Sequence, residues 1–446
     1  MKDMSNSSAS SSLNQVDGGV IHVTDRSHKY NAGWYRAGAP LHGYFPWRRF
    51  FILFSNQEVK MNFSKAMKAA VIIFTGAIAA AGLTACGGIK TAADSPSKSG
   101  VKVGFIAALT GGAAAYGKSQ EEGIRMAVEE INQKGAIPIE LFVEDSKGSP
   151  SDAMNVTKRL IQKKAAVIIG PMTSNEAKAA GPIMQNAKIP SLEISVTAEG
   201  ITEIGDYIFR NSVPESMNIP QTAKKTHRLL GYETAAILYA HDNEQHVTAQ
   251  KYFRKTLEEE GVKIVDVETF GSKDSEYSAQ LTNIENAKPD VVIVCSYYQE
   301  GARILKKMRE MGMNQPVLGD NGFVSPELGK MADAAADNVY VSSMWSAARD
   351  TAATKTFVEN YTKKYGHAPD QFAAAAYDGV YMAMDAVQRA GSVTDTRKIR
   401  DAMAEMKGFN GVCGTFSFDD KRDPVVDLVL LKMEDGVFLA VGKQSS

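Results

Sequence analysis

Residues 166–185 read AVIIGPMTSNEAKAAGPIMQ. A short β-branched run at 166–169 leads through a turn of glycine, proline and hydroxyl residues into a helix-forming segment at 176–185. This pattern predicts a buried strand, a polar turn and a helix. When such units repeat, they form parallel sheets that are covered by helices on both faces. The stretch therefore indicates an α/β fold.

The same alternation of strands and helices extends on both sides of this stretch. Before it, strands are expected at 101–108 and 139–144, and amphipathic helices at 118–134 and 151–163. After it, we expect strands at 191–194, 207–210, 235–239, 263–268 and 291–295, and helices at 219–230, 248–260, 278–285 and 300–311. The break near residue 210 divides these elements into two series. Two series predict two lobes, each built on a doubly wound, mainly parallel sheet flanked by helices.

The C-terminal section has a different pattern. Helices are expected at 356–365 and 372–389, and they are followed by short strands at 414–418, 425–433 and 437–441. These strands are too many and too short for a third lobe of the same kind. We therefore expect them to complete the first two lobes.

The composition excludes several classes of protein. Of the 446 residues, 44% are apolar and 23% are charged, which is ordinary for a globular chain. The 50 basic and 51 acidic residues nearly cancel, so the charge gives no sign of a nucleic-acid-binding surface. Three cysteines are too few for a disulfide framework and lack the paired spacing of a zinc site. The glycine cluster at 110–117 lacks the G-x-G-x-x-G spacing of a dinucleotide site, and no phosphate loop, G-x-S-x-G or H-E-x-x-H motif is expected. The sequence thus predicts no catalytic, cofactor or metal site.

The segment 63–86, FSKAMKAAVIIFTGAIAAAGLTAC, has the order of a secretory signal. Lys65 and Lys68 precede an uncharged stretch at 69–85, and Cys86 ends it. The tetrapeptide 83–86 resembles the bacterial lipobox, in which the cysteine is lipidated and becomes the new N-terminus. We expect a lipoprotein signal peptide at 61–85 and a Ser/Lys/Pro-containing linker at 86–100, the alternative being a buried Ala-rich helix.

Residues 1–60 have neither a helical nor a strand period. Because Met61 stands directly before the basic region of the signal, we expect 1–60 to be disordered or to be an upstream extension from a misplaced start. A membrane-binding arm, suggested by the aromatic and basic residues at 44–51, is the alternative.

Polar residues follow three of the predicted strands, at the edge where open α/β sheets bind ligands. They are Ser174 before its helix, Ser195 and Thr197 on either side of Val196 in the loop after the strand at 191–194, and members of the segment 296–300, which includes Glu300. Each has a purely structural explanation, as a helix N-cap, a Ser/Thr turn and a first-turn charge respectively. Together they offer hydroxyl and amide groups for a carboxylate, and one carboxylate for an ammonium group. The candidate pocket aromatics are Tyr116, Tyr297, Tyr298 and Trp345.

In this order, these residues resemble the type I periplasmic solute-binding proteins of ABC transporters, in the branch that binds branched-chain amino acids (leucine, isoleucine and valine). The resemblance runs from about Val101 to Gly442. It rests on Thr110-Gly111, Tyr116-Gly117, Gly170-Pro171 with Ser174, Ser195-Val196-Thr197-Ala198, Asp274-x-x-Tyr277-x-x-Gln280-Leu281, Tyr377-Asp378-Gly379-Val380 and Gly414-Thr415-Phe416-Ser417-Phe418-Asp419. It implies two lobes joined by three hinge crossovers, with lobe one at 101–215 plus 345–423 and lobe two at 216–344 plus 424–446.

The resemblance also implies roles for the site residues. Ser174 and Thr197, with Val196 in the same loop, would hold the α-carboxylate of an amino acid. The carbonyl oxygen of Ser195 would accept from its α-ammonium group, and Glu300 of the facing lobe would complete that contact. Tyr116 would form a wall of the pocket. Because Glu300 reaches the ligand only when the lobes close, the ligand would favour the closed state.

The chain departs from the family pattern in two places. His246 stands where the family usually has a tyrosine, and its imidazole is expected to form a polar wall of the pocket. Ser146 and Thr173 stand where some relatives have a disulfide. Cys295 and Cys413 would lie in different lobes, so we expect both to be free thiols.

The leading interpretation is a monomeric lipoprotein that captures an amino acid with a branched-chain or other apolar side chain. It would be tethered through Cys86 to a membrane of the cell envelope, on the extracytoplasmic side, in the periplasm or on the outer cell surface. It would deliver the ligand to an ABC permease and its ATPase subunits, without catalysis and without nucleic acid. A ligand-sensing lipoprotein of the same fold is the alternative. An α/β enzyme such as a dehydrogenase is disfavoured because the cofactor loop is missing.

Overall fold

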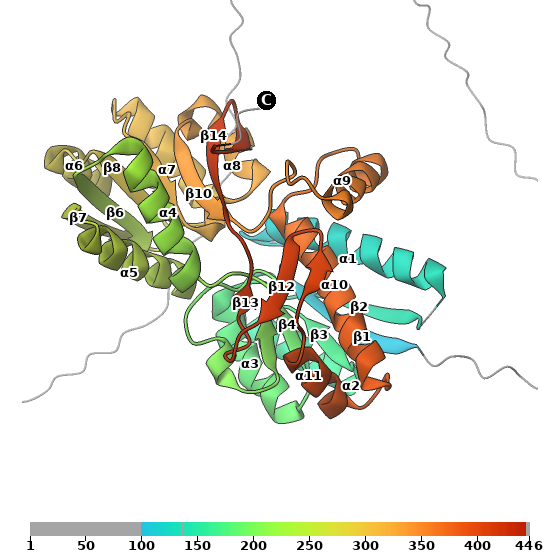
Figure 1. Cartoon of the computed structure of the whole chain (residues 1–446). Helices are drawn as coiled ribbons and strands as arrows, with labels where there is room; N and C mark the ends of the chain where they lie inside the picture. Colours follow the sequence, from blue (N-terminus) through green and yellow to red (C-terminus); the bar gives the residue numbers. More distant parts are fainter. Residues whose placement is uncertain (1–99, 136, 443–446) are drawn as a thin grey trace, which may run out of the picture. The chain divides into compact units, whose positions relative to one another are not determined.

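The computed structural model describes residues 100–135 and 137–442 (Figure 1). The expectations for the N-terminal extension, the signal peptide, Cys86 and most of the linker lie outside these residues. In the described part of the chain, every helix is too short or too polar to cross a membrane.

The first sheet has five parallel strands in the order β2-β1-β3-β4-β5. The strands are β1 (Val101–Ala107), β2 (Ile139–Asp145), β3 (Val167–Ile169), β4 (Ser191–Glu193) and β5 (Ile208–Arg210). Successive side chains of a strand point to opposite faces. Phe105 accordingly packs in one hydrophobic cluster with α1 (Ala114–Lys134) and α10 (Gln371–Ala390), whereas Ile106 packs in another with α2 (Pro150–Gln162) and α3 (Ser174–Ala187). We call this sheet and its helices lobe one.

The second sheet has seven strands in the order β15-β14-β10-β9-β8-β6-β7. The strands are β6 (Thr234–Ala240), β7 (Lys263–Phe270), β8 (Val291–Cys295), β9 (Val317–Gly319), β10 (Val339–Ser343), β14 (Val429–Glu434) and β15 (Val437–Ala440), of which the last two are antiparallel to their neighbours. Its helices are α4 (Glu215–Leu230), α5 (Glu244–Glu259), α6 (Ser278–Ala287), α7 (Tyr298–Glu310) and α8 (Pro326–Ala332). We call this sheet and its helices lobe two.

The predicted alternation of strands and helices in two parallel-sheet lobes is confirmed. The strands β9 and β10 and the helices α8 and α11 (Thr396–Ala404) had not been predicted. β9 is only three residues long and fully buried, so it has no alternation of apolar and polar side chains that would identify it.

The C-terminal section divides between the lobes, as expected, but in a different way. The strands β14 and β15 do complete the second sheet. The strand β12 (Gly414–Phe418) does not extend the first sheet, because it pairs with β11 (Phe409–Gly411) and β13 (Pro424–Val425) in a separate antiparallel sheet. The single strand expected at 425–433 is therefore split, since β13 pairs with β12 in one sheet and β14 pairs with β10 in another.

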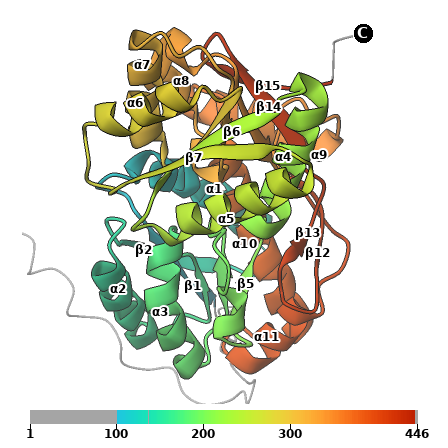
Figure 2. The same ribbon diagram turned by 90° about the vertical axis from the view of Figure 1, so that its left-hand side faces the viewer.

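The chain passes three times between the lobes: from β5 to α4, from β10 to α9 (Ala352–Tyr365), and from β13 to β14. Figure 2 shows β12 and β13 beside lobe one, whereas β14 lies next to α4 and β10 of lobe two. The residue bounds of the lobes stay a prediction from the sequence.

Candidate functional site

The turn between β3 and α3 forms the first part of the site. Gly170 has a φ of 94°, and a Cβ at this position would lie 2.2 Å from the carbonyl oxygen of Ile106, so only glycine fits. The N-cap of α3 is Thr173 and not Ser174: the Thr173 hydroxyl accepts from the amide of Glu176, whose carboxylate in turn accepts from the Thr173 amide at 2.9 Å.

This shift of the cap leaves Ser174 for another contact. The Ser174 hydroxyl is fully buried and accepts from the amide of Ala198 at 3.2 Å. The bond joins the loop after β3 to the loop after β4. A hydroxyl has one donor and two acceptor positions, so the proton of Ser174 stays available for a further acceptor.

The loop after β4 is anchored through its side chains. The Ser195 hydroxyl donates to the carbonyl of Met172 at 2.6 Å and accepts from the Gln120 amide at 2.8 Å. Thr197 donates to Glu215 at 3.0 Å. The Val196 side chain packs in a hydrophobic cluster of lobe one, so only its backbone can contact a ligand.

Tyr116 of α1 reaches across from lobe one to lobe two. Its hydroxyl donates to the carbonyl of Gly322 at 2.5 Å and accepts from the amide of Tyr298 at 2.9 Å. Its ring lies 4.5 Å from that of Phe372 and 5.7 Å from that of Tyr297, between ring centroids. Burial raises the pKa of Tyr116 well above its ordinary value, so the hydroxyl stays protonated and can donate.

Glu300 lies in the first turn of α7, after β8. Its side chain is 12% exposed and pairs with Arg303 at 3.6 Å, while the oxygen Oε2 is buried without a hydrogen-bond partner. Burial raises the pKa of this carboxyl group. The pair with Arg303 therefore compensates only part of the desolvation of the Glu300 carboxylate, and Oε2 stays available to accept from a cationic group.

Two other predicted residues are placed differently. Trp345 packs in a T-shaped arrangement against Phe357 at 5.7 Å between centroids and belongs to the core around α9, because it lies in the crossover that leads from β10 to α9. His246 does not form a wall of the cavity between the lobes. Its Nδ1 lies 2.6 Å from Oδ2 of Asp320, both side chains are buried, and its ring meets the edge of Tyr297.

Glu215 and Asp320 are buried site residues that the sequence had not indicated. Glu215 begins α4 at the first crossover, and its Oε1 accepts from the Thr197 hydroxyl of lobe one and from the Asn321 amide of lobe two. Burial and the nearby Asp320 raise the pKa of Glu215 to about 8. Asp320 directly follows β9, so the rule that sites lie at strand ends would have found it if β9 had been predicted.

A small cavity lies between the lobes. Its volume is about 10 Å³, and its lining includes Tyr116, Met172, Ser195, Gln245 and Tyr297. This is room for about one water molecule. A ligand of the size of an amino acid therefore requires the lobes or these side chains to move.

Polar contacts also join the lobes at the rim of this cavity. The Asn175 side chain at the start of α3 donates to the carbonyl of Asp242 at 3.2 Å and accepts from the amide of Glu244 at 2.9 Å. Lys178 pairs with Glu244 at 2.6 Å. The structure thus shows the two lobes in contact, with α3 facing α5.

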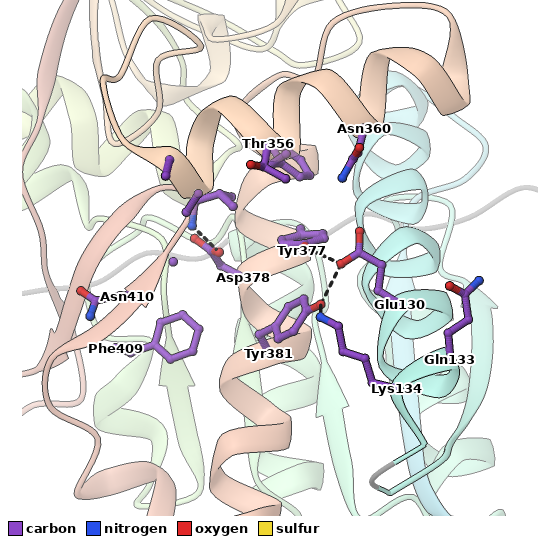
Figure 3. A pocket seen from close by; sticks show the side chains of 15 residues that line it. Glu130, Gln133, Lys134, Thr356, Asn360, Tyr377, Asp378, Tyr381, Phe409 and Asn410 are labelled. Atoms are coloured by element: carbon purple, nitrogen blue, oxygen red, sulfur yellow. Dashed lines mark hydrogen bonds between the residues drawn. The ribbon is translucent and has the colours of Figure 1, made fainter.

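A larger groove, of about 780 Å³, lies on lobe one between α1, α9, α10 and β11 (Figure 3). Its carboxylates are already engaged. Glu130 accepts from the hydroxyls of Tyr377 and Tyr381, and Asp378 accepts from the backbone amides of Val412 and Cys413. It contains none of the predicted site residues.

Two further features concern a phosphate-binding loop and a disulfide, neither of which the sequence predicts. The stretch 112–119, GAAAYGKS, fits the phosphate-loop pattern G-x-x-x-x-G-K-[ST], but from Ala114 onward it is part of α1. A phosphate loop needs a run of free backbone amides before its helix, whereas here the helix begins at the third residue of the pattern and the amides of Ala114 and Gly117 already donate to the carbonyls of Gly111 and Ala113. Cys295 and Cys413 are free and buried, as expected from the sequence.

Comparisons with known proteins agree on the fold. The family model described as periplasmic binding protein matches residues 100–436. The leucine-, isoleucine-, valine-, threonine- and alanine-binding protein of Pseudomonas aeruginosa is 24% identical over 328 residues, which cover 72% of this chain and 87% of that protein.

Two solved structures are also similar. The branched-chain amino acid transporter substrate binding protein of Streptococcus pneumoniae, in complex with isoleucine, is 30% identical with a TM-score of 0.73, and the match covers 76% of this chain and 98% of that one. A solute binding protein of an ABC transporter from Rhodopseudomonas palustris, in complex with 3,4-dihydroxybenzoic acid, is 27% identical with a TM-score of 0.70, and the match covers 76% and 96% of the two chains.

Proposed function

Because this chain belongs to the periplasmic binding protein family, among the ABC-transporter solute-binding proteins of the branched-chain amino acid type, we propose that it captures an amino acid between its lobes and delivers it to a permease. From the sequence, the first candidate ligands are amino acids with a branched-chain or other apolar side chain. A lipid on Cys86 holds the protein to a membrane of the cell envelope, on the extracytoplasmic side.

The observation that carries this proposal is that the loops after β3 and β4 are joined in lobe one, while a buried carboxyl group with an unpaired oxygen follows β8 in lobe two. The Ser174 hydroxyl, whose proton is free to donate, is bonded to the loop after β4, and both belong to lobe one. The half-satisfied carboxyl group of Glu300 belongs to lobe two. A zwitterion offers the complementary pair of charges, a carboxylate for the first and an ammonium for the second.

The proposed contacts follow from this arrangement. Ser174 holds the carboxylate through its hydroxyl, and Val196 and Thr197 hold it through their backbone amides, because the Thr197 hydroxyl already donates to Glu215. The Ser195 carbonyl and Glu300 hold the ammonium group. Tyr116 and Tyr297 line the space between the lobes. Trp345 has no contact in this scheme, because it lies in the core around α9.

A thermal-shift screen of the protein, first freed of any carried-over ligand, tests the proposal. At about 100 times Kd, a ligand adds roughly 2.7 kcal/mol to the free energy of unfolding, so a cognate amino acid should raise Tm clearly. The screen includes leucine, isoleucine, valine, threonine and alanine, with benzoate and 3,4-dihydroxybenzoate as competing classes. A shift with the benzoates alone would replace the amino acid by an aromatic acid. No shift with any amino acid would overturn the proposal.

A further inference from the structure

Gln245 lines the small cavity between the lobes with an unused hydrogen-bond donor. It lies in the first turn of α5, where its backbone amide donates to the N-cap side chain of Asn243 at 3.0 Å. The residue is 4% exposed, and its Nε2 is buried without a hydrogen-bond partner. Such donors are rare in folded proteins because an unpaired buried group is destabilising. A donor left unpaired in a ligand cavity therefore points to an acceptor on the ligand.

The neighbouring residue explains why Gln245 has this place. His246 stands where the family has its aromatic residue, but its ring is turned to Asp320 at 2.6 Å and to the edge of Tyr297. The residue of this turn that lines the cavity is Gln245. The polar wall expected from His246 is thus supplied by the residue before it.

The charges around the cavity indicate whether the acceptor on the ligand is neutral or anionic. Tyr297 lines the same cavity, and its pKa is raised. The largest cause is burial, and the carboxyl groups of Glu176, Asp320 and Glu300 also contribute. Their negative potential therefore extends to this part of the site. It opposes an anionic ligand side chain, whereas a neutral oxygen avoids this repulsion.

We propose that Gln245 donates a hydrogen bond to an uncharged oxygen, a hydroxyl or an amide carbonyl, on the side chain of the bound amino acid. The inference rests on the proposed function and replaces the apolar side chain first expected for the ligand by a polar, uncharged one. The protein then prefers an amino acid with a hydroxyl or amide side chain to the apolar amino acid of the same shape. Threonine and valine form such a pair, and asparagine and leucine form a second one.

Isothermal titration calorimetry with these four amino acids tests the inference. We expect threonine to bind about tenfold more tightly than valine, and asparagine more tightly than leucine, because a cavity with an unpaired donor rejects the apolar analogue. Aspartate, which has the shape of asparagine and a negative charge, should bind more weakly than asparagine.

The variant Gln245→Met keeps the length of the side chain and removes the donor. We expect it to lose the preference for threonine by weakening threonine binding about tenfold while leaving valine binding unchanged or stronger. The control is Gln133→Met in the groove of Figure 3, which should keep the wild-type ratio.

The outcomes separate this inference from the proposed function. If valine binds the wild-type protein as tightly as threonine does, Gln245 does not read the side chain, and the amino-acid function stands alone. If none of the amino acids binds, the proposed function fails and the inference fails with it. The wild-type ratio decides the matter even if Gln245→Met does not fold.

Discussion

At the scale of single residues, Glu300 shows how burial prepares a side chain for a ligand. The pKa of its carboxyl group is raised by burial, and Oε2 has no partner. An ammonium group at this position would restore the lost solvation, and a hydrogen bond to a charged group contributes about 1.5–3 kcal/mol. Removing the carboxylate should therefore weaken amino-acid binding much more than it affects folding.

We predict that Glu300→Ala weakens binding of the cognate amino acid by roughly thirtyfold or more, equivalent to about 2 kcal/mol. Tm of the ligand-free protein should stay unchanged or rise slightly, because a partly unpaired buried charge is removed. Titration calorimetry and a melting curve measure the two effects. Glu310→Ala, at the exposed end of the same helix, is the control. Unchanged affinity would leave Glu300 as a charge that complements the helix dipole.

At the scale of elements, the strand ends could be predicted and the details of the site could not. The positions of Ser174, Ser195 and Glu300 follow from strands whose β-branched runs are clear in the sequence. The cap at Thr173 was missed because a hydroxyl residue on either side of a helix start has the same composition signal. Asp320 was missed with β9, whose three buried residues have no period. Because Asp320 is the partner of His246, the orientation of the His246 ring could not be inferred without β9. The position of Gln245 at the cavity could not be inferred either.

The first crossover, from β5 to α4, contains a titratable contact between the lobes. Glu215 accepts from Thr197 and from Asn321, and burial together with Asp320 raises its pKa to about 8. A carboxyl group with a raised pKa binds a proton more tightly in the folded chain than in the unfolded one. Its contribution to the free energy of unfolding is therefore fully present below the ordinary pKa of a glutamate, and it is lost as the pH rises through the pKa of Glu215 in the folded chain.

We predict that Glu215→Gln makes the free energy of unfolding less dependent on pH between about pH 4.5 and pH 8. The wild-type slope should be more negative than that of the variant by up to about 1.4 kcal/mol per pH unit, the value for one proton. Urea denaturation at a series of pH values measures it, with Glu259→Gln on the exposed side of α5 as the control. Parallel curves for wild type and Glu215→Gln would contradict the role of Glu215.

At the scale of the whole molecule, one hydroxyl group makes two hydrogen bonds across the contact between the lobes. Tyr116 bonds both Gly322 and Tyr298 of lobe two, and its loss leaves a buried carbonyl and a buried amide without their partner. Tyr116→Phe should therefore shift the ligand-free protein toward an open arrangement and increase its radius of gyration in small-angle X-ray scattering. Tyr377→Phe removes a hydroxyl that bonds Glu130 within lobe one, so it should lower stability without changing the radius. If both variants keep the wild-type radius, the closed arrangement depends on the apolar packing of Tyr116, Met172 and Phe372 against lobe two and not on the hydroxyl.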